Sequence, residues 1–105
     1  MKYAETLNGI AIDVQATDYE IEDAVKERIR KLVTRLSRRF QGITYVDIFL
    51  ENKESKSTNQ KQVSIRLGIP GNDPFASEYG DSFMALLASI EEKLRRQLEK
   101  RQNNP

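Results

Sequence analysis

Two long stretches of this chain repeat apolar residues every three or four positions, which is the period of an amphipathic helix. In the first stretch the repeating residues are Ile21, Val25, Ile29, Leu32, Val33, Leu36 and Phe40. In the second they are Phe83, Leu86, Leu87, Ile90, Leu94 and Leu98. Each predicted helix therefore has one apolar face to bury, and the fold must supply a layer that covers both.

The segments around these helices alternate apolar and polar residues, which is the pattern of half-buried strands. The apolar positions lie at 10–14, 46–50 and 63–69, and residues 75–79 form a fourth, shorter candidate. Residues 1–9 show no period and are expected to be a flexible lead-in. The pattern predicts an α+β fold of order β-α-β-β-β-α, with a four-stranded sheet and two helices packed on one of its faces. A length of 105 residues suits one domain that spans 1–105.

Several boundaries stay open at the level of sequence. Thr17 to Glu20 could be a capping box, or the first helix could begin later, near Glu22. Gly42 is expected to end it, and Asp81 or Ser82 to cap the second helix. Residues 52–61 are polar and predict a long hairpin loop.

The composition excludes most catalytic and metal chemistry. The chain has no Cys and no His, which removes thiolate nucleophiles, the commonest general base and the commonest transition-metal ligands. Asp47 and Glu51 would lie ~13 Å apart on a strand, too far for a coupled carboxylate pair. We therefore expect no enzyme activity, catalytic residue, bound metal, cofactor or small-molecule substrate. No apolar run could cross a bilayer and no signal peptide is evident, so we expect a cytoplasmic protein without a membrane partner.

The net charge is only +1, but the cations are concentrated on the two helices. Residues 26–39 carry seven Lys or Arg against one acid, and residues 82–105 carry five against three. Arg28, Lys31, Arg35 and Arg38 share one helical face, and so do Lys93, Arg96 and Lys100. The candidate RNA-binding residues are Lys26, Arg28, Lys31, Arg35, Arg38, Arg39, Lys93, Arg96, Lys100 and Arg101.

Such faces are often only solvated, but two positive faces in a near-neutral protein favour an RNA backbone as the partner. Tyr45 and Phe49 share the strand face opposite the core and could stack on bases. Asp47 and Glu51 on that same face would repel phosphates, which favours ordinary packing of the two rings. A protein–protein adaptor with an acidic partner is the remaining alternative.

At this point the chain resembles a known family, the short ribosome hibernation promoting factors and the related ribosome-associated translation inhibitors. The most specific match is the stretch from Glu92 to Lys100, which resembles the family's Lys-Leu-x-Arg-Gln-Leu-x-Lys. Pro70-Gly71 followed by Ala76-Ser77 resembles the family's strand-turn-strand. Tyr19-Glu20-Ile21 resembles its lead-in to the first helix and favours the later helix start.

The resemblance implies a fold similar to double-stranded RNA-binding domains. It also implies binding to ribosomal RNA of the small ribosomal subunit, in the decoding region, where the protein would block messenger and transfer RNA. The matching contact candidates are Lys26, Arg35, Lys93, Arg96 and Lys100. Because the chain ends after the second helix, we expect it to need a separate ribosome-dimerising factor, or to act on single ribosomes. A general double-stranded RNA-binding module is the nearest rival.

Overall fold

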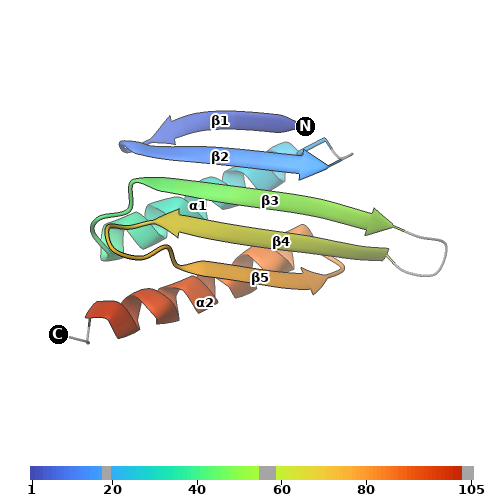
Figure 1. Ribbon diagram of the computed structural model, residues 1–105. Coiled ribbons are helices and arrows are strands. Elements are labelled where there is room, and N and C mark those ends of the chain that lie inside the picture. The colour runs from blue at the N-terminus through green and yellow to red at the C-terminus, as the bar shows by residue number, and fades with distance from the viewer. Residues whose placement is uncertain (18–19, 55–58, 103–105) are drawn as a thin grey trace.

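The chain forms a five-stranded sheet with two helices on one face, as the computed structural model shows (Figure 1). Residues 1–17, 20–54 and 59–102 are described. The strands are β1 (Lys2–Leu7), β2 (Ile10–Thr17), β3 (Tyr45–Glu54), β4 (Asn59–Gly68) and β5 (Phe75–Gly80), and the helices are α1 (Asp23–Arg39) and α2 (Phe83–Gln102). The sheet keeps the chain order β1-β2-β3-β4-β5, and every neighbouring pair is antiparallel except β2 and β3. That parallel pair requires a crossover, which α1 provides.

The core lies between the sheet and the helices, as the period of the apolar residues predicts. Ile12, Val14 and Ala16 stand opposite Val46, Ile48 and Leu50 across the β2–β3 pair, and all six are buried. Every member of the two predicted helical stripes is buried as well. No polar or charged residue of the described ranges is buried. The confirmed expectation is thus the α+β class with two helices on one sheet face.

The prediction of four strands, with residues 1–9 as a flexible lead-in, is wrong. β1 pairs with β2 along its whole length, and Tyr3, Glu5 and Leu7 point toward the helix side. The turn is Asn8-Gly9 with φ of 51° and 80°, a pair of positive angles that this dipeptide readily adopts. The sequence of β1 does not alternate cleanly between apolar and polar residues, because Glu5 occupies one of its inward positions. The Glu5 carboxylate accepts two hydrogen bonds from Arg30.

The structure also fixes three further boundaries. α1 begins late, with Glu22 as its N-cap, so the capping box at 17–20 is wrong, although Asp18 and Tyr19 lie outside the described residues. Ser82 caps α2, since its Oγ accepts a hydrogen bond from the Ala85 amide at 3.3 Å. The β3–β4 pairing continues to Glu54 opposite Asn59, so a loop over 52–61 is too long; residues 55–58 lie outside the described ranges.

Candidate nucleic-acid interface

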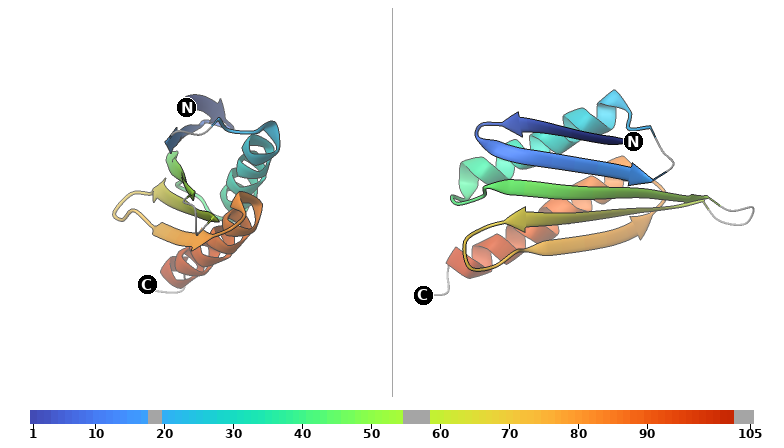
Figure 2. Two further views of the ribbon diagram at one scale, coloured as in Figure 1. Left: turned by 90° about the vertical axis from the view of Figure 1, so that its right-hand side faces the viewer. Right: turned by 45° about the horizontal axis from the view of Figure 1, so that its top comes forward.

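The two helices lie side by side and run in the same direction, which brings their basic ends together (Figures 1 and 2). Ion pairs join them in matching order, Arg28 Nη2 to Glu91 Oε1 at 2.8 Å and Arg39 Nη2 to Glu99 Oε1 at 2.6 Å. The last turn of α1 carries Arg38 and Arg39, and that of α2 carries Lys100 and Arg101. Cations at helix C-termini are favoured by the helix dipole, and here two such ends share one side of the molecule.

Arg28 belongs to the contact between the helices rather than to an open surface. Its side chain is 14% exposed and that of Glu91 is 16% exposed. Arg35 also reaches Glu91, at 3.6 Å, but stays 60% exposed. Arg28 is therefore available to a partner only to a small extent, whereas Arg35 remains accessible.

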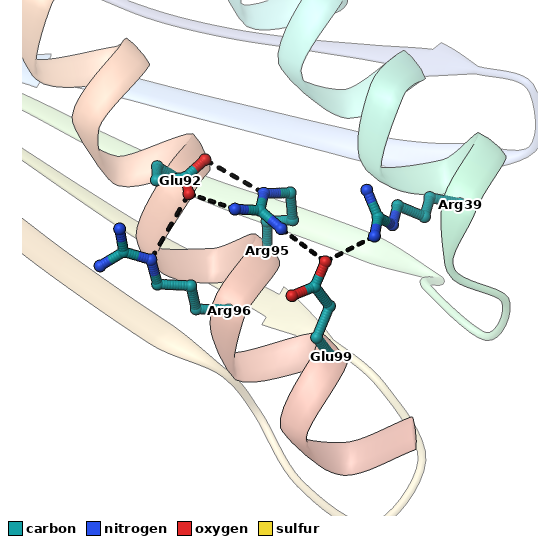
Figure 3. Close-up of polar contacts among 5 residues, drawn as sticks. All are labelled: Arg39, Glu92, Arg95, Arg96 and Glu99. Carbon is teal, nitrogen blue, oxygen red and sulfur yellow. Dashed lines mark hydrogen bonds and ion pairs between the residues drawn. The ribbon is translucent and has the colours of Figure 1, made fainter. Parts of the chain in front are cut away.

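The positive charge of the two helix faces is partly neutralised by acids of α2 (Figure 3). Glu99 accepts hydrogen bonds from both Arg39 and Arg95. Glu92 pairs with Arg95 and, at 3.4 Å, with Arg96. The hydrogen bonds from Arg95 hold the pKa of the Glu92 carboxyl below its usual range. The two carboxylates therefore link three guanidinium groups in one row, which runs from Arg39 of α1 across α2 to Arg96.

Five candidate cations have no acidic partner among the described residues: the half-buried Lys26 and Arg101, and a further three, Lys31, Arg38 and Lys100. All three are exposed. Lys31, Arg35 and Arg38 follow one another at helical spacing and line a shallow hollow of about 370 Å³ beside Leu7. We name the following set of exposed or half-exposed cations the helix face: Lys31, Arg35, Arg38, Arg39, Arg95, Arg96 and Lys100.

Three other predicted residues, Lys26, Lys93 and Arg101, contact the strands or the turn between them. Lys26 is on the β1 side of α1, with its Nζ 5.0 Å from the centroid of the Tyr3 ring. Lys93 pairs with Glu78 of β5 at 3.0 Å, and Arg101 donates to the Pro70 carbonyl at 3.3 Å. The site prediction omitted Arg95 and the acids of α2, although the spacing of Glu92, Arg95 and Glu99 is the signature of paired charges on a helix.

No group of three or more Asp, Glu, His or Cys residues that could hold a metal occurs in the described part of the chain. No helix within it is long and apolar enough to cross a membrane.

A family model described as sigma-54 modulation protein / S30EA ribosomal protein matches residues 12–104. The chain belongs to this family. The match spans both helices, β3, β4, β5 and β2 from Ile12 onward, so it includes every residue of the helix face. No curated protein sequence matches the chain.

Two solved structures share the fold of this S30EA family member. A ribosomal subunit interface protein from Coxiella burnetii is 22% identical, with a TM-score of 0.66 over 89% of this chain and 98% of that one. The N-terminal domain of Protein Y from Thermus thermophilus is 18% identical, with a TM-score of 0.58 over 88% of this chain and 98% of that one. The resemblance to a ribosome-associated, hibernation-type family is thereby confirmed.

Proposed function

We propose that this S30EA family protein binds the small ribosomal subunit through its helix face, in the decoding region, and blocks access of messenger and transfer RNA. The family supports association with ribosomes in the cytoplasm. The observation that carries the proposal is the parallel packing of α1 and α2, which gathers seven exposed or half-exposed cations on one side of the molecule. Phosphate oxygens are the ligands that such a surface fits, because each neutralised phosphate releases condensed counterions.

The inhibition is steric and needs no bond-making step. A-form RNA is recognised mainly by shape, phosphates and 2′-hydroxyl groups, and cations on two rigid helices can follow such a backbone. A protein seated there excludes other ligands by mass action, and it leaves when competing initiation components bind more strongly. Pairing of ribosomes would then depend on a separate dimerising factor.

The test is co-sedimentation with purified small subunits across a salt series, with a plain RNA duplex as competitor. About four phosphate contacts would lower the affinity by about 100-fold between ~50 and ~200 mM salt. We expect salt-sensitive binding that excess duplex does not displace. Complete displacement by duplex would instead indicate a general double-stranded RNA-binding module, and absence of any RNA binding would favour a protein–protein adaptor.

Glu92 and Glu99 should restrain binding to RNA, because they compete with phosphates for Arg39, Arg95 and Arg96. The double variant Glu92→Gln/Glu99→Gln should bind a plain RNA duplex about tenfold more tightly at ~0.1 M salt. Fluorescence anisotropy with a labelled duplex measures this gain.

The matched control for this gain is Glu20→Gln/Glu22→Gln, which removes two exposed acids before α1, at the end of the helix remote from its basic last turn. It changes the net charge by the same amount. Equal gains in the two variants would mean that net charge alone acts, and no gain in the first would mean that the helix face does not contact RNA.

A further inference from the structure

The face of the sheet opposite the helices is not covered by any described part of the chain (Figure 2). Three large apolar side chains are exposed there: Phe49 at 43%, Phe75 at 46% and Tyr79 at 57%. They come from β3 and β5, which flank β4. Soluble proteins rarely leave several large apolar side chains together in water without a use for them.

The strand register sets Phe49 and Phe75 around a hollow with a polar floor. Phe49 stands opposite Ser64, and Ser64 stands opposite Ser77. The two serine hydroxyl oxygens lie 2.8 Å apart, and Gln62 donates to the Ser77 Oγ at 3.1 Å. Because serines are short, a hollow of about 320 Å³ remains, which is lined by Phe49, Glu51, Gln62, Ser64 and Phe75.

Carboxylates surround the exposed Phe49 ring. Asp47 and Glu51 flank it along β3, and Asp13 of β2 stands directly opposite Asp47. Burial, and next the charge of Asp13, raise the pKa of the Asp47 carboxyl even though Arg66 opposes the shift. Lys53 pairs with Glu51 at 3.4 Å and Arg66 stands opposite Asp47, so two cations of the chain face the three carboxylates of Asp13, Asp47 and Glu51, and an excess of negative charge remains. It disfavours phosphates and favours a cationic group.

Two cations of the chain already lie over aromatic rings on this face of the sheet. The Arg66 guanidinium carbon lies 5.2 Å from the Phe75 ring centroid, and the Lys53 Nζ lies 5.8 Å from that of Tyr79. No such contact occupies the Phe49 ring within the described residues. A guanidinium group stacked on Phe49 would lie between the carboxylates of Asp47 and Glu51, which combines a cation–π contact with charge pairing.

We propose that this open sheet face docks an arginine-bearing segment of a basic protein, with a guanidinium group on Phe49 and the adjoining chain in the hollow beside Phe75. The inference rests on the proposed function for its setting, because proteins that bind nucleic acid commonly carry basic arms. The helix face and the open sheet face then suit partners of opposite charge, RNA on one side and a basic protein arm on the other.

The test uses the whole chain alone and a short fluorescent peptide of alternating arginine and glycine. Anisotropy should report salt-sensitive binding that Phe49→Ser weakens about tenfold and that Asp47→Asn/Glu51→Gln weakens similarly. Met84→Ser is the matched control, because Met84 is also 43% exposed but lies on α2. A lysine–glycine peptide should bind more weakly, since an ammonium group does not stack as a guanidinium does.

Several outcomes would overturn the proposal. One is absence of peptide binding, and another is equal loss in Phe49→Ser and Met84→Ser. Preference of this face for labelled oligouridine over the peptide would make it a nucleic-acid platform instead. Co-sedimentation with small subunits separates the two proposals, since Phe49→Ser leaves the helix face and its salt dependence intact. Failure to sediment would refute the proposed function, while the peptide measurement would still be informative.

Discussion

Reversing the charge of Arg38 and Lys100 in the variant Arg38→Glu/Lys100→Glu should abolish binding to small ribosomal subunits, with an affinity loss of at least about 100-fold at ~0.1 M salt. These two residues come from different helices, are exposed and have no acidic partner among the described residues. Each substitution removes a proposed phosphate contact and adds a repelling charge. The residual binding should depend little on salt, because the contacts that release counterions are lost.

The control for charge reversal is Lys2→Glu/Lys61→Glu, which makes the same change in net charge outside the helix face. Lys2 is on β1 and Lys61 on β4, and neither belongs to the cations that the two helices gather. We expect this variant to keep most of its affinity for small subunits, with a small loss from the change in net charge. The dependence of its affinity on salt concentration should stay the same. Co-sedimentation compares the two variants, and thermal unfolding followed by circular dichroism shows whether both are folded. Equal losses would mean that the helices do not dock on the RNA.

Arg28→Met should lower the free energy of unfolding by about 2 kcal/mol, because it leaves Glu91 shielded from water without its closest cation. The loss of one partner from a fully buried ion pair costs about 3–5 kcal/mol. The cost in the free energy of unfolding should be smaller here, because both side chains keep some exposure and Arg35 still reaches Glu91 at 3.6 Å. Urea unfolding measures the change.

The double variant Arg28→Met/Glu91→Leu should recover most of the lost stability, because it replaces a shielded ion pair by an apolar contact of similar volume. RNA binding should change little in it, since Lys31, Arg38 and Lys100 are retained. A stable single variant would show that Arg28 is not needed to satisfy Glu91. A double variant less stable than the single one would show that the charged pair is itself preferred at the contact between the helices.

The spacing of apolar residues was enough to predict most of the fold. Stripes such as Ile29, Leu32 and Leu36, and alternations such as Val46, Ile48 and Leu50, are buried as the period requires. β1 escaped prediction because its inward positions include a charged residue, Glu5, which is satisfied only by Arg30 from a distant helix. The Asn8-Gly9 turn was the available signal, since this dipeptide favours the positive φ values of a tight hairpin.

The site was predicted less completely, although the cations themselves were correctly located on two helices. Local periodicity decides which side of each helix carries charge and which side is buried. The sequence by itself therefore determined the charged faces of the helices and the residues of the core. Only the tertiary structure decided that the helices run in parallel, that Arg28 is enclosed with Glu91 and that Glu99 joins Arg39 to Arg95. Whether a cation is free depends on its distance to an acid on another element, and local spacing does not encode that distance. The same holds for the open sheet face, where Phe49 and Phe75 surround a hollow only because β3 and β5 flank β4.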